Sequence, residues 1–287
     1  MILIADSGST KTDWAFVAPN GDIVQRLNTP GINPFHQDDA TIIDILKHLS
    51  VSSVPIREKG EELSLYFYGS GCTPEQTPRI HNLLLNTFGN VSSIEVYSDM
   101  LGAARAVCGR YEGIACILGT GANSCLYDGE RIVANTPALG YVLGDEGSGA
   151  VLGRLFLNAL YKGRLPQSLR ETFERETSLT MADVIRCVYR EPLANRFLAS
   201  FSPFISQHLD VELLRELVID NFRQFLRNNV APYQAHQSLL PPVSFVGSMA
   251  FCYSNELREA ARLEEFTVGQ IVKSPMEGLI AYHHVLH

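Results

Sequence analysis

A short segment near the start of the chain carries residue types that bind phosphate and metal ions. Asp6-Ser7-Gly8-Ser9-Thr10-Lys11-Thr12 directly follows an apolar run at residues 2–5. Glycine and small hydroxyl residues leave backbone N–H groups uncovered, so such a turn can hold phosphate oxygens. An Asp at the end of a buried strand can hold Mg²⁺, usually through water. The segment lacks the GxxxxGK[ST] pattern of a Walker P-loop, and it also suits an ordinary polar hairpin.

A second segment repeats this pattern in the middle of the chain. Gly119-Thr120-Gly121-Ala122-Asn123 ends the apolar run 114–118. Each segment is followed by a second apolar run, an Asx-Gly turn (Asn20-Gly21 and Asp128-Gly129) and a third run, which is a strong hairpin signal. An internal repeat of this kind indicates two related lobes. Two such loops could hold phosphates across a cleft.

Acidic residues occur at two further places where strands give way to helices. Asp99 follows the strand-like run 94–97 and precedes a helical pattern. A carboxylate there can cap the helix, and capping does not exclude catalysis. Gly144-Asp145-Glu146-Gly147-Ser148-Gly149 precedes an apolar helix, where acids complement the helix dipole and glycines let a ligand approach closely.

Hydrophobic periodicity indicates the elements that must position these residues. We expect strands at residues 2–5, 14–18, 23–27, 63–68, 94–97, 114–118, 124–127, 131–134, 243–246 and 266–272, and helices at 41–49, 74–88, 100–107, 211–229 and 276–286, with another ending near 262. Residues 147–232 are expected to be mostly helical. Strands and helices that alternate in both halves predict an α/β fold with a cleft between two lobes.

Composition limits the class of protein. The 287 residues are 46% hydrophobic and 19% charged, with a formal net charge of −8, as in an ordinary globular protein of about two domains. The chain has no cluster of Lys and Arg that would form a basic patch despite the negative net charge, so nucleic acid is not an expected partner. No apolar stretch approaches the ~20 residues that span a bilayer. The opening residues lack a basic signal-peptide region, and we expect a cytoplasmic protein without a membrane partner.

Cysteine and histidine usage suggests neither disulfides nor a metal site. No two of the six cysteines have CxxC spacing, and we expect reduced, mostly buried thiols. His283, His284 and His287 are expected to belong to a frayed helix end. Trp14 is expected in the core or at a lobe interface.

Taken together, these motifs resemble the superfamily of sugar kinases, heat-shock chaperones and actin. Segment 6–12 is similar to its first phosphate motif and segment 119–121 to its second. Val246-Gly247-Ser248 is similar to the adenosine motif, where Gly-Gly is more usual, and segment 274–278 to the second connecting motif. Within the superfamily, Asp99 and segments 119–123 and 144–148 resemble N-acetylglucosamine kinases and the BadF-BadG-BcrA-BcrD ATPase family.

The resemblance implies an actin-like ATPase fold: two ribonuclease-H-like lobes with an interlobe cleft that binds Mg-ATP and closes around a sugar. Residues 1–106, completed by a C-terminal helix at 274–287, would form the N-terminal lobe. Residues 107–273 would form the C-terminal lobe. A homodimer is a fair expectation from the resemblance.

The resemblance also implies roles for single residues. Asp99 matches the catalytic base, and Asp6 would hold Mg²⁺. The expected ATP and phosphate contacts are Ser7, Gly8, Ser9, Thr10, Lys11, Thr12, Gly119, Thr120, Gly121, Gly247 and Ser248. The expected sugar contacts are Asn33, Asp99, Thr120, Asn123 and Asp145. In N-acetylglucosamine kinases a Gly-Trp pair before Gly-Asp-Glu-Gly helps to hold the sugar, whereas this chain has Ala138-Leu139 there.

The implied activity is ATP-dependent phosphorylation of an amino sugar, with N-acetylglucosamine at its 6-hydroxyl as the lead substrate. Glucosamine, a muramic derivative and glucose stay open, because of the departure at Ala138-Leu139. One alternative is a BadF-type ATPase that activates a partner through an iron–sulfur cluster held by cysteines. Cys116 and Cys125 fall on strand-like runs, which argues against such a cluster. Another alternative is a non-catalytic sugar sensor. The presence of Asp6, Asp99 and both phosphate loops argues against it.

Overall fold

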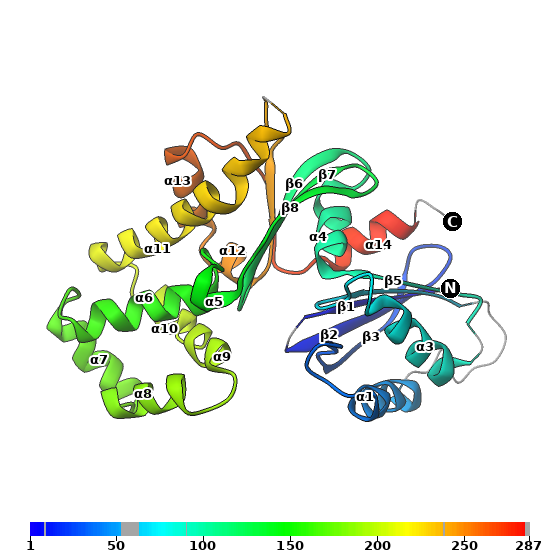
Figure 1. The fold of residues 1–287 in the computed structure, drawn as a ribbon, viewed down its shortest axis with the longest axis horizontal. Coiled ribbons are helices and arrows are strands. Elements are labelled where there is room, and N and C mark those ends of the chain that lie inside the picture. The colour runs from blue at the N-terminus through cyan, green and yellow to red at the C-terminus, as the bar shows by residue number, and fades with distance from the viewer. Residues whose placement is uncertain (9, 53–62, 90, 238, 285–287) are drawn as a thin grey trace. The chain divides into compact units, whose positions relative to one another are not determined.

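The computed structural model describes residues 1–8, 10–52, 63–89, 91–237 and 239–284. They form two compact units, each built on a mixed five-stranded sheet (Figure 1). Unit 1 is drawn from Met1–Tyr111, Gly129–Arg131 and Ser274–His287, and unit 2 from Glu112–Asp128 and Ile132–Lys273.

The sheet of unit 1 has the strand order β3-β2-β1-β4-β5. Its strands are β1 (Ile2–Ser7), β2 (Lys11–Val17), β3 (Ile23–Pro30), β4 (Ser64–Gly69) and β5 (Ser93–Ser98). The first three strands are antiparallel, whereas β4 and β5 run parallel to β1. Ser7 lies opposite Gly69, and Gly69 lies opposite Ser98. The carboxyl ends of three parallel strands therefore meet at one edge, which is where open α/β sheets bind their ligands.

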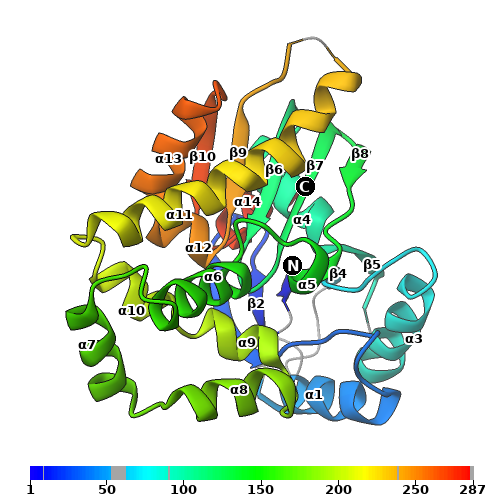
Figure 2. The same cartoon turned by 60° about the vertical axis from the view of Figure 1, so that its left-hand side comes forward.

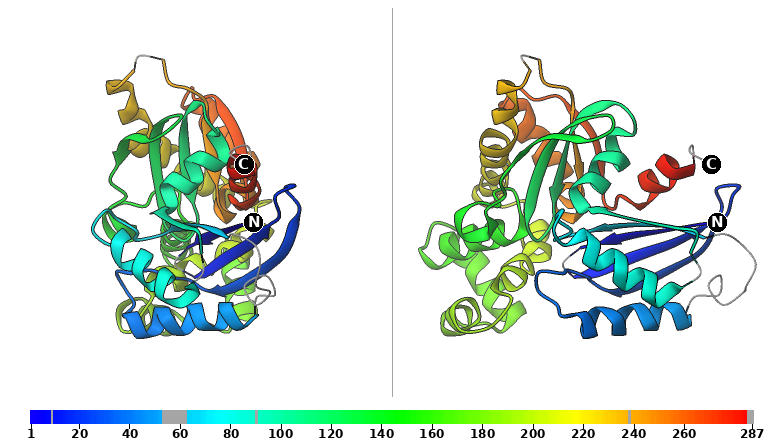
Figure 3. Two further views of the ribbon diagram at one scale, coloured as in Figure 1. Left: turned by 90° about the vertical axis from the view of Figure 1, so that its right-hand side faces the viewer. Right: turned by 45° about the vertical axis from the view of Figure 1, so that its right-hand side comes forward.

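Helices cover both faces of this sheet. They are α1 (Asp39–Ser52), α3 (Thr77–Phe88), α4 (Asp99–Cys108) and α14 (Met276–His284). Successive strand side chains point to opposite faces, so Leu3 joins one core cluster and Ile4 another. The first cluster includes residues of α1 and α3, and the second includes residues of α14. Figure 3 shows α1 and α3 together on one side of the blue strands.

The sheet of unit 2 repeats the order of unit 1, with β10-β9-β6-β7-β8 in place of β5-β4-β1-β2-β3 (Figure 2). Its strands are β6 (Glu112–Leu118), β7 (Ala122–Asp128), β8 (Ile132–Thr136), β9 (Val243–Val246) and β10 (Val268–Val272). The first three are antiparallel, and β9 and β10 are parallel to β6. This shared topology confirms the internal repeat and the α/β fold expected from the sequence.

Unit 2 carries most of its helices between β8 and β9. They are α5 (Gly140–Leu143), α6 (Gly149–Tyr161), α7 (Gln167–Thr177), α8 (Met181–Tyr189), α9 (Ala194–Ala199), α10 (Ser202–Gln207) and α11 (Glu212–Phe225), and α12 (Ser248–Cys252) and α13 (Ser254–Leu263) follow β9. Helices α6 and α11 contact each other and supply Phe156, Phe222 and Phe225 to the main core cluster.

The expected helix over 211–229 is α-helical only as far as Phe225. It continues as the π-helical turn η1 (Leu226–Val230) and the 3₁₀ turn η2 (Ala231–Ala235). Pro232 lacks the N–H that would donate to the carbonyl four residues earlier, so a regular α-helix cannot continue there.

Two sequence expectations need correction. All six cysteines are free, but only Cys72, Cys116 and Cys125 are buried, and Cys252 is exposed. The frayed end expected for the last histidines is wrong for His283, which is buried, whereas His287 lies outside the described residues.

No helix among the described residues combines the length and hydrophobicity needed to cross a membrane.

Candidate functional site

The β1–β2 loop of unit 1 is held tightly by its own hydroxyl groups. The Oγ of Ser7 lies 2.7 Å from Oγ1 of Thr12, and both residues are fully buried. Ser7 Oγ also accepts from the Ile32 N–H at 2.9 Å. The Gly8 N–H donates to the Lys11 carbonyl at 3.0 Å and closes the turn. These hydroxyls therefore brace the loop from inside. Thr10 is exposed, and Ser9 lies outside the described residues.

Asp6 is the last acidic group before this loop and is half-buried. It pairs across the strands with Asp13, whose carboxylate accepts from the Lys11 ammonium at 2.7 and 3.0 Å. Burial, and after it the nearby charges of Asp99 and Asp13, raises the pKa of Asp6 to about 7, against the opposing effect of Lys11. Asp6 thus lies in a region of excess negative charge, which a bound cation would relieve.

Asp99 is the first residue of α4, at the edge where β5 ends. The capping side chain is that of Ser98, which accepts from the Leu101 N–H at 3.2 Å. The capping role considered for Asp99 is therefore taken by its neighbour. Asp99 Oδ1 accepts from the Met100 N–H at 2.8 Å, and the Ser70 hydroxyl donates to the same carboxylate. Burial raises the pKa of Asp99, against the lowering effect of these hydrogen bonds.

Asn33 follows β3 and lies against the loop after β4, at the same edge of the unit 1 sheet. Gly71 in this loop has φ +78°, and a side chain there would collide with Oδ1 of Asn33. That Oδ1 accepts from the Phe35 N–H at 2.9 Å. Ser70, adjacent to Gly71, contacts Asp99. Unit 1 therefore gathers the predicted residues Asp6, Asn33 and Asp99 around the ends of β1, β4 and β5.

Two residues that support this edge were not identified from the sequence. Ser70 follows β4 in a Gly-Ser-Gly segment, which is a local signal that resembles the two loops that were identified. Arg79 on α3 donates to the carbonyls of Pro34 and Gln37 at 2.6 and 2.9 Å and to Asp39 at 2.7 Å, and so fixes the segment after Asn33. Nothing local marks Arg79, because its contacts are some 40 residues away.

In unit 2 the β6–β7 loop contacts the start of α6. The carbonyls of Gly119 and Thr120 accept from the N–H groups of Gly149 and Ala150 at 2.8 and 3.2 Å. Ser148 caps the helix through Val151 at 3.1 Å, so the neighbouring acids are not its caps. The glycine loop and the Gly-Asp-Glu-Gly-Ser segment therefore form one connected structure.

Asp145 has φ +54°, a left-handed conformation that is strained for an Asp, and its carboxylate lies against Gly121. Burial and the charge of Glu146 raise the pKa of Asp145 to about 6, with burial the larger cause, against a hydrogen bond from the Ala122 backbone that lowers it. A side chain at Gly121 would lie 3.2 Å from Oδ2 of Asp145, so the absence of one leaves room for this carboxylate.

The remaining predicted residues of unit 2 flank the same loop. Asn123 Oδ1 accepts from the Asn135 side chain and from the Ser124 N–H, each at 2.9 Å. Gly247 has φ +126°, and a side chain there would collide with the Leu118 carbonyl at the end of β6. Ser248 is exposed at the start of α12. Unit 2 thus brings together segments 119–123, 144–148 and 247–248 from three parts of the chain.

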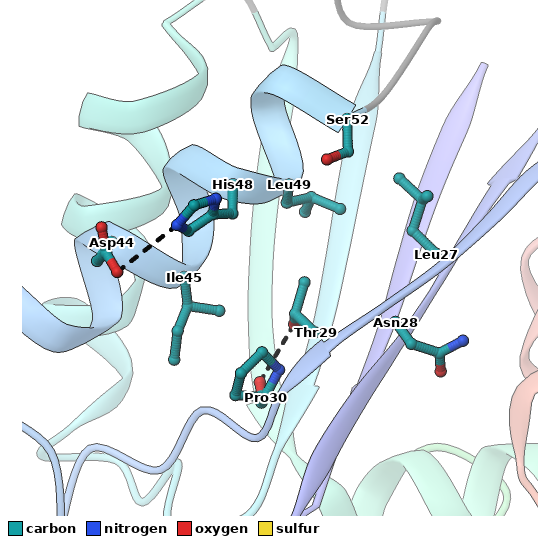
Figure 4. A pocket seen from close by; sticks show the side chains of 9 residues that line it. All are labelled: Leu27, Asn28, Thr29, Pro30, Asp44, Ile45, His48, Leu49 and Ser52. Atoms are coloured by element: carbon teal, nitrogen blue, oxygen red, sulfur yellow. Dashed lines mark hydrogen bonds and ion pairs between the residues drawn. The ribbon is translucent and has the colours of Figure 1, made fainter.

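A separate pocket of about 370 Å³ lies between β3 and α1 (Figure 4). Leu27, Ile45 and Leu49 form its apolar walls, and His48 lies 3.8 Å from Asp44 at its rim. None of the candidate residues lines it. The pocket is therefore distinct from the site described for unit 1.

Comparison with known proteins gives a consistent result. No model of a known protein family matches the sequence, and no curated protein matches it. Among solved structures, a candidate N-acetylglucosamine kinase from Porphyromonas gingivalis is 50% identical to this chain. The match covers 99% of both chains with a TM-score of 0.94.

More distant structures share the fold alone. A candidate N-acetylglucosamine kinase from Chromobacterium violaceum is 17% identical over 98% of each chain, with a TM-score of 0.70. A ROK hexokinase from Thermus thermophilus is 15% identical over 98% of this chain and 96% of its own, with a TM-score of 0.51. With half of its residues identical to the P. gingivalis protein over the full length, this chain belongs to the N-acetylglucosamine kinase family of the actin-like ATPase superfamily.

Proposed function

We propose that this protein transfers the γ-phosphoryl group of ATP to the 6-hydroxyl of N-acetylglucosamine. The observation that carries the proposal is the pair Asp6 and Asp99, two acids held near each other at the carboxyl edge of the unit 1 sheet. The 50% identity to a protein named as a candidate N-acetylglucosamine kinase supports the choice of sugar.

Asp99 is assigned as the general base. Its carboxylate takes the proton of the sugar 6-hydroxyl as that oxygen bonds to the γ-phosphorus, and the bond from phosphorus to the bridging oxygen of ADP breaks. Met100 and Ser70 hold the carboxylate by hydrogen bonds. The raised pKa of Asp99 makes it a stronger base than an exposed carboxylate. A positioned base contributes typically about 10²–10⁴-fold to the rate.

Asp6 is assigned to Mg²⁺. Its oxygen donors suit this hard cation, and the excess negative charge around it favours a cation. No cluster of three or more acidic, His or Cys side chains suited to a metal occurs among the described residues. In this proposal Asp6 and the phosphates of ATP would together hold the ion. When bound, Mg²⁺ neutralises phosphate charge during the transfer.

The phosphate contacts are assigned to both glycine loops. In unit 1, Thr10 and Lys11 are exposed and available to the phosphates, while Ser7 and Thr12 hold the loop in shape. In unit 2, segment 119–121 and Gly247-Ser248 are assigned to ATP. A backbone without bulky side chains lets phosphate oxygens approach closely.

The sugar contacts are assigned to Asn33 in unit 1 and to Thr120, Asn123 and Asp145 in unit 2. Their carboxylate and amide groups can pair with sugar hydroxyls, which are both donors and acceptors. Asp145 is held in a strained conformation at a loop, and such strain is concentrated at ligand sites.

The iron–sulfur ATPase alternative gains no support from Cys116 and Cys125. Cys116 and Cys125 are fully buried inside β6 and β7, so their thiols cannot reach a cluster at a subunit surface.

The test is a coupled assay of ADP release with Mg-ATP against N-acetylglucosamine, glucosamine, N-acetylmuramic acid and glucose. The product is then identified by ³¹P–¹H NMR. We expect turnover with N-acetylglucosamine and a phosphorus coupled to the C6 protons. ADP release that no sugar stimulates would instead indicate an ATPase. Sugar binding without turnover would indicate a sensor.

A further inference from the structure

The Glu146-Gly147 turn of unit 2 is held by one continuous helical segment. Asn221 on α11 accepts the Gly147 N–H at 3.0 Å. On the π-helical turn η1, Asn228 and Asn229 donate to the two carboxylate oxygens of Glu146 at 2.8 and 3.3 Å. Three asparagines from one helix therefore contact two adjacent residues that immediately follow Asp145.

The helix geometry explains how one segment makes all three contacts. Residues 221, 225 and 228–229 are spaced by about one helical turn and lie on the same face. Phe225 packs so closely that a side chain on Gly147 would lie 2.9 Å from its Cβ. The wider π turn then directs two consecutive asparagines at one carboxylate, and π turns of this kind are frequent at functional sites.

The same segment is also fixed to the strand that carries Asn123. The Asn229 carbonyl accepts from Ser124 Oγ and from Thr136 Oγ1, each at 3.0 Å. Ser124 directly follows Asn123 on β7. The turn η1 therefore connects the turn after Asp145 to the strand of Asn123, and both of these residues are assigned to the sugar.

The Asn221 side chain is hydrogen-bonded at one end only. It is fully buried, and its Nδ2 has no hydrogen-bond partner among the described residues. A buried amide satisfied at only one end costs desolvation free energy that its other bond offsets only in part. The one bond it does make, from the Gly147 N–H at 3.0 Å, fixes the orientation of the turn.

We propose that Asn221, together with Asn229, is a positioning residue for sugar binding. It acts through Gly147 to keep Asp145 in its left-handed conformation against Gly121. The role rests on the proposed function, since Asp145 is assigned there to the sugar. Loss of the acceptor lets the turn relax and moves the Asp145 carboxylate away from its place.

The experiment compares three variants. Asn221→Leu removes the acceptor at similar size, and Asn221→Asp keeps an oxygen that can accept from Gly147. Gln224→Leu makes the same amide-to-leucine change on the exposed side of α11. We expect Asn221→Leu to raise KM for N-acetylglucosamine about tenfold, with KM for ATP unchanged. Asn221→Asp and Gln224→Leu should stay within about twofold of the unaltered protein. A lower kcat with unchanged KM in Asn221→Leu would show a merely structural role and overturn the proposal.

Hydrogen exchange gives a readout that does not depend on sugar turnover. The Gly147 amide should exchange about tenfold faster in Asn221→Leu than in the unaltered protein, Asn221→Asp and Gln224→Leu. If the Gly147 amide exchanges faster in Asn221→Leu but the unaltered protein phosphorylates no sugar, the proposed function is rejected and the positioning contact is kept. Unchanged exchange would reject the contact itself.

Discussion

Single carboxyl groups carry the chemistry proposed for unit 1, and Asp6 is held where its neutral form is favoured. Burial and the nearby acidic charges raise its pKa from the ordinary value of 3.8 to about 7 in the folded protein. Between these two pH values the folded state keeps a proton that the unfolded state has lost. Stability contributed by this group therefore falls as pH rises from about 4 to about 7, and the deficit is complete above pH 7.

Replacement of Asp6 by Asn should remove this deficit. We expect Asp6→Asn to be more stable than the unaltered protein at pH 8, by at most about 4 kcal/mol, with the difference shrinking toward pH 4. Urea denaturation at several pH values measures the difference. Asp210→Asn, an exposed acid on the surface, should show no such trend. Adding Mg²⁺ to protein that already holds ATP should stabilise the unaltered protein and not Asp6→Asn, and equal stabilisation of both would contradict the assignment of the ion.

The residues found from the sequence have a local signal, which the missed Ser70 shares and which the missed Arg79 and Asn221 lack. Asp6, Asp99 and Asp145 stand at the ends of apolar runs beside glycine or hydroxyl residues, so their place is evident locally. Arg79 contacts Pro34 and Gln37, which lie 45 and 42 residues away in the sequence. Asn221 contacts Gly147, which lies 74 residues away. Such contacts depend on the fold, and one sequence carries no local pattern for them.

At the scale of elements, the packing of α14 on the unit 1 sheet depends on His283. Its ring stacks on Tyr66 with centroids 3.7 Å apart, and its Nε2 lies 2.8 Å from the Tyr68 hydroxyl. The Tyr68 hydroxyl accepts from Arg105 on α4 at 2.9 Å. A terminal position in the sequence gave no indication of these contacts, because they join residues about 215 positions apart.

Truncation of His283 should therefore destabilise unit 1. We expect His283→Ala to lower the free energy of unfolding by about 2–4 kcal/mol, from lost packing and from a buried Tyr68 hydroxyl that loses one of its two hydrogen bonds. His284→Ala removes the neighbouring exposed ring and should cost less than about 0.5 kcal/mol. Thermal or urea unfolding of both variants checks this, and equal effects would mean that α14 does not depend on the buried ring.

The junction of β6, β9 and α12 depends on the absence of a side chain at Gly247. Gly247→Ala forces a Cβ into the Leu118 carbonyl at a positive φ and should cost at least about 3 kcal/mol. Gly119→Ala is the matched change, because a Cβ there would have nothing within 4 Å. It should leave the melting temperature within about 2 °C. Tolerance of alanine at position 247 would contradict the packing described.

At the scale of the molecule, the two sheets have the same strand order, which follows from the repeated strand–loop–strand pattern in the sequence. All ten expected strands are present, because short apolar runs bounded by turn residues are strong signals. The region 147–232 was expected only to be helical. Its division into separate helices and a π turn depends on packing around a shared aromatic core, which periodicity alone does not encode.

Ligand binding should stabilise the whole chain. ADP with N-acetylglucosamine, each at about 100 times its Kd, contributes about 2.7 kcal/mol per bound ligand and should raise the melting temperature by about 5 °C or more. Differential scanning fluorimetry measures the shift. Glucose should give a smaller one, and a larger shift with glucose would move the sugar assignment to it.

The most direct test of the central claim is the rate of N-acetylglucosamine phosphorylation by Asp99→Asn. The variant keeps the size of the side chain and removes the base. We predict that kcat falls by about 10²–10⁴-fold while KM for ATP stays near that of the unaltered protein and the melting temperature does not fall. Asp210→Asn, with the same change at an exposed site, should keep full activity. A fall in kcat of less than about threefold in Asp99→Asn would contradict the assignment of Asp99 as the base.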